Sequence, residues 1–166
     1  MPITCRLLAL DPAAAASLSK DPGTLARHAA SCDTFTELYY FWHGIDYLLA
    51  RSEAPEAARC LRFGGTEIPS GPGLPVSRLH QPAAMPVVAT RLAAVPAEDL
   101  VVAYDPEALD SAGVYPERWV ALSEESDLLG DLLEHYRYLQ QFTARRKQDR
   151  RAMLVLYERI KDDSGF

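Results

Sequence analysis

Apolar residues recur at helical spacing in the first third of the chain. They lie three or four positions apart and would form one face of a helix: Leu38, Phe41, Trp42, Ile45, Leu48 and Leu49. Thr34 and Glu37 precede this face at the spacing of a capping box, in which each side chain binds a backbone N–H of the first turn. The pattern therefore predicts a helix over residues 34–51.

A longer apolar stripe follows toward the C-terminus. Its members are Leu128, Leu129, Leu132, Leu133, Tyr136, Leu139 and Phe142. Ser123 precedes them as a suitable N-cap, which predicts a helix over residues 124–148. The helix would close with the basic residues Arg145, Arg146, Lys147, Arg150 and Arg151. The helix dipole favours such an end, so we interpret the cluster as solvated; an anion-binding or partner-binding patch is the alternative.

Proline and glycine divide the remaining chain into shorter pieces. An Asp-Pro dipeptide joins a good N-cap to a residue suited to the first helical turn. It predicts helix starts at Asp11-Pro12, Asp21-Pro22 and Asp105-Pro106. Two more helices are expected over residues 83–95 and 96–103. Residues 60–82 are rich in glycine and proline, which predicts a loop with short extended pieces at 61–63 and 76–79.

Apolar runs near the two ends of the chain predict strands. Residues 3–10 form one, and residues 152–157 are apolar on both alternating faces, as in a central strand covered on both sides. The absence of a regular βαβ alternation favours an α+β fold. We predict a single compact domain over residues 1–160, in which a small sheet including the N- and C-terminal strands packs with four or more helices. Residues 161–166 are expected to form a loose tail.

Composition narrows the possible functions. The chain has 17 basic and 23 acidic residues, and its net charge of −6 disfavours a nucleic-acid binder. No apolar stretch approaches the roughly 18–20 residues that span a membrane, and the start lacks the pattern of a signal peptide. Three widely spaced cysteines, Cys5, Cys32 and Cys60, predict reduced thiols in a cytoplasmic protein.

Several weaker motifs have simpler structural explanations. His28 and Cys32 are four residues apart, but no second pair completes a zinc site, so we predict neither a metal nor a cofactor. Gly64-Gly65 lacks the surroundings of a phosphate-binding loop, and a turn is the simpler role. Cys60 lies beside Arg59 and Arg62, a setting that can lower a thiol pKa; ordinary burial is the alternative.

The segment FWHGIDYLLA, residues 41–50, holds the strongest candidate for a site. Residues three and four apart share a helix flank, which here carries Tyr39, His43, Asp46 and Tyr47. Asp46 can orient the His43 imidazole as a general-base or ligand-orienting pair; a half-buried structural histidine is the alternative. Gly44 costs a helix up to ~1 kcal/mol relative to alanine, which predicts another element crossing closely over it.

Several segments resemble the YfbM-like family, a bacterial domain of unknown function. They are WHGIDYLL at 42–49, FGG at 63–65, YDPEAL at 104–109, VYPERW at 114–119 and LVLY at 154–157. The resemblance extends over almost the whole chain, to about residue 158. It implies a compact, cytoplasmic α+β protein and supplies no catalytic residues.

Two functions follow as hypotheses. The first is a non-catalytic binding or protein-interaction domain, with a pocket formed by Trp42, His43, Arg78, Tyr104, Tyr115 and Trp119. Its partner would be a protein or a small ligand, with no nucleic acid or membrane involved, and the chain would be a monomer or a homodimer. The alternative is a small enzyme in which His43, oriented by Asp46, acts as general acid or base and Arg78 binds an anionic group.

Overall fold

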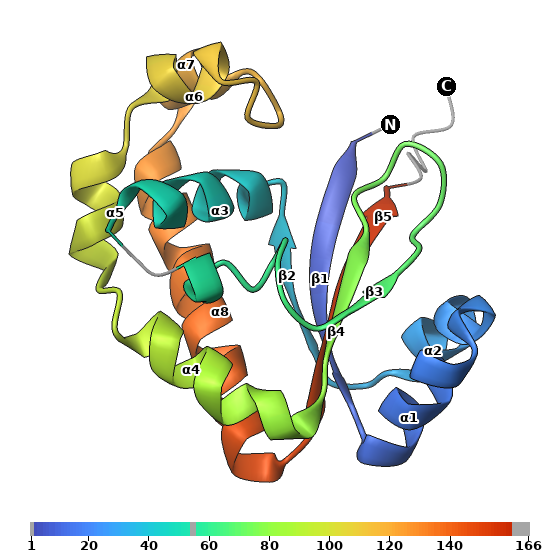
Figure 1. Ribbon diagram of the computed structural model, residues 1–166. Coiled ribbons are helices and arrows are strands. Elements are labelled where there is room, and N and C mark those ends of the chain that lie inside the picture. Colours follow the sequence, from blue (N-terminus) through green and yellow to red (C-terminus); the bar gives the residue numbers. More distant parts are fainter. Residues whose placement is uncertain (1, 54–55, 161–166) are drawn as a thin grey trace.

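In the described part of the chain, five strands form one sheet, and every neighbouring pair in it is antiparallel (Figure 1). They are β1 (Ile3–Leu10), β2 (Phe35–Tyr39), β3 (Thr66–Ile68), β4 (Ser77–His80) and β5 (Ala152–Arg159), in the order β2-β1-β5-β4-β3. The two terminal strands pair along their whole length, from Ile3 opposite Arg159 to Leu10 opposite Ala152. The predicted α+β domain, with both terminal strands in its sheet, is thus confirmed.

The computed structural model describes residues 2–53 and 56–160, and the predicted tail over 161–166 lies outside them. The helices are α1 (Pro12–Lys20), α2 (Leu25–Ser31), α3 (Phe41–Arg51), α4 (Met85–Ala93), α5 (Ala97–Ala103), α6 (Pro106–Ser111), α7 (Trp119–Glu125) and α8 (Leu128–Asp149). The described residues also form the short 3₁₀ helices η1 (Pro22–Thr24), η2 (Glu56–Ala58) and η3 (Pro82–Ala84). All three Asp-Pro dipeptides precede a helix, as predicted.

The sheet separates two hydrophobic cores because side chains of a strand alternate between its faces. From β5, Met153, Val155 and Tyr157 join the larger core, which contains residues of α3 to α8. Leu154 and Leu156 join the smaller core under α1 and α2. Figure 1 shows these two helices on one side of the sheet and α3 to α8 on the other. The prediction of a central strand covered on both sides is confirmed.

The helix predicted over residues 34–51 begins later than expected. Residues 35–39 form strand β2, and α3 begins at Phe41. Thr34 caps no helix, since its hydroxyl donates to the Asp33 carboxylate and its carbonyl accepts from Ala9 N–H. The alternation of FTELY suits a strand as well as a helix start, and pairing with β1 decides between them.

Two other boundaries differ from the sequence predictions. The long C-terminal helix begins after Asp127, whose carboxylate accepts from Gly130 N–H, while Ser123 lies in the separate helix α7. Residues 61–63 form a turn, and strand β3 at Thr66–Ile68 was not predicted. The expected pieces at 83–95, 96–103 and 76–79 correspond to α4, α5 and β4.

Candidate functional site

The His43 side chain lies where α3 meets the loop between α6 and α7. The backbone N–H of Tyr115 in this loop donates to His43 Nδ1 over 3.0 Å. The Tyr115 hydroxyl in turn accepts from Ile3 N–H over 2.8 Å, which fastens the loop to β1. His43 is half-buried, and its ring stacks on Trp42 at 4.8 Å between centroids. Backbone and ring contacts therefore fix the imidazole in one orientation.

This contact also fixes the tautomer of His43. A backbone N–H can only donate, so Nδ1 must present its lone pair, and the proton of the neutral ring sits on Nε2. Burial and the nearby Arg62 and Arg59 guanidinium groups lower the pKa of His43 to about 4. The ring is therefore neutral at physiological pH, with Nε2–H as a hydrogen-bond donor.

The predicted pair between Asp46 and His43 is not formed. The Asp46 carboxylate binds arginine side chains instead. Its carboxylate is buried and accepts from Arg59 Nη2 at 2.8 Å and Arg59 Nε at 3.3 Å. A buried carboxylate requires such a partner, and Arg59 satisfies it with two parallel bonds. The Asp46 side chain is thus bound to a group that follows α3, and no hydrogen bond joins it to His43.

Arg62 links the two predicted site residues indirectly. Its Nη1 lies 3.4 Å from His43 Nε2 and 3.7 Å from Asp46 Oδ2, and its side chain is 44% exposed. Both Nη1 and Nε2 carry protons, so two hydrogen-bond donors lie side by side at this short distance. With His43 neutral, the two guanidinium groups face two carboxylates, since Arg59 also lies 4.0 Å from the exposed Glu56 carboxylate. Arg62 is the more exposed of the two arginines. We call Arg62 and His43 the donor pair; no sequence pattern indicated it, because Arg62 stood out only as a neighbour of Cys60.

The other predicted ligand-binding residues lie mostly in the core. Trp42 and Trp119 are buried, and Trp119 Nε1 donates to Val114 carbonyl over 2.8 Å. The Tyr104 hydroxyl is paired with Ser123 Oγ over 2.9 Å. Arg78, on β4, forms an ion pair with Glu67 at 3.1 Å. Trp42 Nε1 and Arg78 Nε are buried without a hydrogen-bond partner among the described residues. His43 differs from them because its Nε2 lies beside a second donor, Arg62.

Comparison with known proteins places this chain in a family. A family model described as "Domain of unknown function (DUF1877)" matches residues 1–156. The chain belongs to this family. The crystal structure of YfbM from Escherichia coli, a protein of unknown function, is similar with a TM-score of 0.70 and 13% identity, over 92% of this chain and 98% of that one. The YfbM-like resemblance is thereby confirmed, and at this identity it shows the fold alone. No curated protein matches the sequence.

Other features of this DUF1877 chain bear on its chemistry. In the described part of the chain, no three His, Cys, Asp or Glu residues are grouped so as to hold a metal ion. None of its described helices has the length and apolar composition needed to cross a bilayer. Burial raises the pKa of Cys60 to about 12, so the thiolate suggested by its arginine neighbours does not form at neutral pH.

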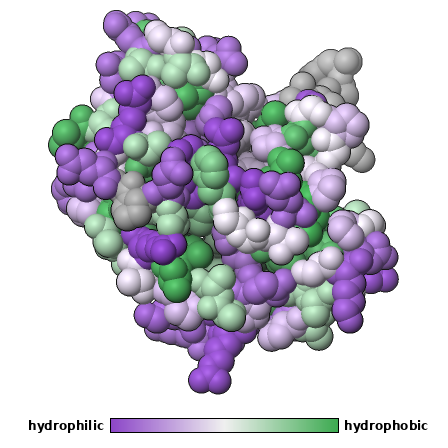
Figure 2. All heavy atoms as spheres, in the orientation of Figure 1, coloured by the Kyte–Doolittle hydropathy of each residue, from purple (hydrophilic) through white to green (hydrophobic). Residues whose placement is uncertain are grey.

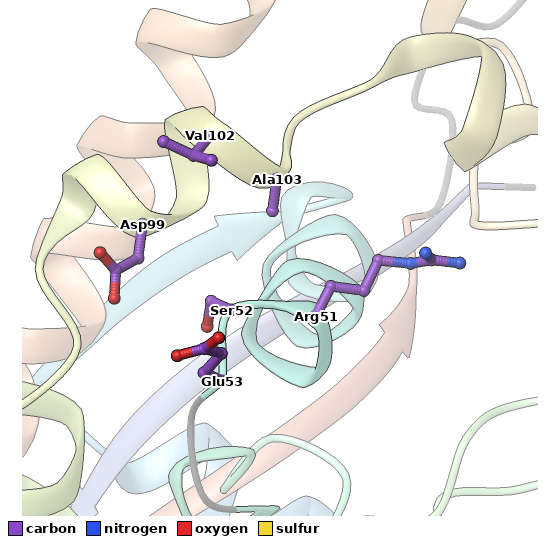
Figure 3. Close-up of a pocket in the computed structure, with 6 residues that line it drawn as sticks. All are labelled: Arg51, Ser52, Glu53, Asp99, Val102 and Ala103. Carbon is purple, nitrogen blue, oxygen red and sulfur yellow. The ribbon is translucent and has the colours of Figure 1, made fainter.

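A pocket of about 480 Å³ lies between the end of α3 and α5. Its lining residues are Arg51, Ser52, Glu53, Asp99, Val102 and Ala103. Figure 3 shows the Arg51 side chain extending away from the carboxylates of Glu53 and Asp99. The Arg51 guanidinium lies over the Tyr47 ring, 4.4 Å from its centroid. Because the charged groups diverge, we assign no chemistry to this pocket.

Proposed function

We propose that this protein is a non-catalytic binding domain that recognises a carboxylate of an acidic protein partner at the donor pair. The observation that carries the proposal is the 3.4 Å separation of Arg62 Nη1 and His43 Nε2, both of which are donors. A carboxylate oxygen can accept from two donors at once, and charge-assisted bonds of this kind are strong. The exposed part of the Arg62 guanidinium is a cation that favours the same ligand.

The geometry supports binding better than acid–base catalysis. The only unprotonated nitrogen of neutral His43 is Nδ1, which already accepts from Tyr115 N–H. Its Nε2 would become a base only after loss of a proton from a neutral imidazole, which does not occur near neutral pH. The direct carboxylate partner expected for a general base is also absent, since Asp46 binds Arg59.

A protein partner fits this site better than a small molecule. The donor pair consists of one half-exposed and one half-buried side chain, and it can hold a single acidic group. Small-molecule sites normally enclose most of their ligand, whereas one surface contact contributes little affinity by itself. An acidic segment of a protein would add contacts on the surrounding surface to the bond with the Arg62 guanidinium.

The test is titration with a capped Glu-Glu peptide, followed by the NMR signals of His43 and Arg62. We expect these signals to shift, and to shift less with rising salt. Arg62→Gln and His43→Asn should each weaken binding by about tenfold, the usual effect of removing a charge-assisted bond. The asparagine of the His43→Asn variant retains an acceptor for Tyr115 N–H. Its shorter side chain withdraws the donor from Arg62 without releasing the loop.

Two controls separate recognition from general charge and folding effects. Arg27→Gln removes an exposed arginine on α2 and should leave the titration unchanged. A capped Gln-Gln peptide should not shift the His43 signal. Equal responses of the Arg62→Gln and Arg27→Gln variants, or unshifted His43 and Arg62 signals with the Glu-Glu peptide, would contradict the proposal.

A further inference from the structure

A second cavity, of about 320 Å³, lies between η2, the loop that follows it and α4. Its lining is mainly apolar and includes Phe63, Val87 and Val88, with the two polar side chains His80 and Arg91. Figure 2 shows a hydrophobic patch between the η2 region and α4, bordered by hydrophilic atoms. Phe63 and Val87 are 41% and 49% exposed, so the mouth of this pocket is itself apolar.

His80 places one hydrogen-bond acceptor in this apolar wall. The side chain is 2% exposed, and its Nε2 lies 2.8 Å from the Cys60 carbonyl oxygen. A carbonyl oxygen only accepts, so Nε2 carries the proton and Nδ1 presents a lone pair. Burial lowers the pKa of His80, which keeps the ring neutral. Among the described residues, Nδ1 has no hydrogen-bond partner.

The wall beside this nitrogen is built from backbone. Gly64 and Gly65 have φ of +73° and +65°, values that favour glycine. A Cβ at Gly65 would lie 2.5 Å from the Leu79 carbonyl oxygen and 3.2 Å from His80 Nδ1. A side chain here would therefore crowd the strand and the acceptor together. The FGG segment keeps the edge of the His80 ring free of side chains.

Arg91 supplies the only cation among the residues that line the pocket. It is exposed on α4, and within the described ranges no carboxylate lies in ion-pair distance of it. An apolar cavity with one buried acceptor and one cation at its border complements a ligand with three matching parts. These parts are an apolar body, one hydrogen-bond donor and one negative charge.

We propose that this pocket binds a small aromatic carboxylic acid that also carries a hydroxyl or ring N–H. The ring would lie against Phe63, Val87 and Val88, the donor would bind His80 Nδ1, and the carboxylate would pair with Arg91. A volume of about 320 Å³ accommodates a single ring system with a short side chain. The pocket shares no residue with the donor pair, so this proposal can be tested independently of the proposed partner binding.

The experiment compares three probes by ligand titration, monitored through the amide signals of Gly64, Gly65 and Val87. The probes are 4-hydroxyphenylacetate, phenylacetate, which lacks the donor, and 4-methylphenol, which lacks the carboxylate. We expect 4-hydroxyphenylacetate to bind most tightly and to shift the His80 Nδ1 resonance. Phenylacetate should bind about fivefold more weakly, the factor expected of one ordinary hydrogen bond, and should leave that resonance in place.

Two exposed substitutions test the remaining contacts. Arg91→Gln should weaken binding of 4-hydroxyphenylacetate severalfold and leave 4-methylphenol unaffected, whereas Arg27→Gln should change neither. Val87→Trp should obstruct the mouth and abolish binding of all three probes. Equal affinities for phenylacetate and 4-hydroxyphenylacetate, equal effects of the two arginine variants, or unshifted pocket amides would each overturn the proposal.

Discussion

At the scale of single residues, backbone groups decide the chemistry of two histidines. At His43 a backbone N–H occupies Nδ1, so the outward nitrogen is a donor. At His80 a backbone carbonyl occupies Nε2, so the remaining nitrogen is an acceptor. The same side chain thus favours an acidic ligand in one place and a donor-bearing ligand in the other. Each outcome follows from the direction of a single main-chain contact.

The lowered pKa of His43 predicts a loss of stability in acid. The unfolded chain takes up a proton below about pH 6.5, whereas folded His43 does so only near pH 4. Protonation of His43 therefore leaves the free energy of unfolding unchanged above pH 6.5. It lowers this free energy as the pH falls from 6.5 toward 4. Chemical denaturation at pH 7 and pH 4 should show the wild-type protein losing about 2 kcal/mol more than His43→Asn, after discounting for partial exposure. Equal losses in the two proteins would contradict this assignment.

The predicted close crossing at Gly44 is confirmed, and its cause is Trp119. A Cβ at position 44 would lie 2.5 Å from Trp119 Cη2. Trp119 is fully buried and hydrogen-bonded, so it cannot easily move away. Gly44→Ala should therefore lower the free energy of unfolding by about 1–3 kcal/mol, despite the better helix propensity of alanine. In a Trp119→Phe background, which removes the crowding atoms, thermal or denaturant unfolding should show a smaller loss.

At the scale of elements, the start of α3 shows what local patterns miss. Thr34 and Glu37 have capping-box spacing, but the chain there pairs with β1, far earlier in the sequence. Local sequence predicts both outcomes, and only the long-range pairing selects the strand. The site is similar: the helix position of His43 was predicted, whereas its partner Tyr115 lies 72 residues away. The Arg59 partner of Asp46 follows α3 through a connection that has no periodic pattern.

This difference predicts unequal effects of two alanine substitutions. Asp127 is a true N-cap of α8, so Asp127→Ala should lower the free energy of unfolding by about 1 kcal/mol. Thr34 serves no helix, so Thr34→Ala should change it by less than about 0.5 kcal/mol, as at ordinary surface positions. Denaturant unfolding of both variants measures the contrast. If Thr34→Ala lowered the free energy of unfolding as much as Asp127→Ala does, Thr34 would after all act as a helix cap.

At the scale of the whole molecule, strands β1 and β5 pair at the centre of the sheet. Strand β5 pairs with β1 on one side and with β4 on the other, and it contributes to both cores. The donor pair and the apolar pocket both involve the connection between α3 and β4, outside this central unit. The connection between α3 and β4 thus brings Arg62 to His43 on α3, and Phe63 to His80 on β4 and to α4.

Such an arrangement predicts a graded pattern of hydrogen exchange. Amides of β5 and of the β1 residues paired with it should exchange only through global unfolding, since breaking their ladder exposes both cores. Amides of the edge strands β2 and β3, each paired on one side, should open locally and exchange faster. Exchange resolved by NMR, repeated in mild denaturant, should show the β5 rates following global stability. Exchange in β5 as fast as in β2 would mean that the paired strands β1 and β5 do not form the stable centre.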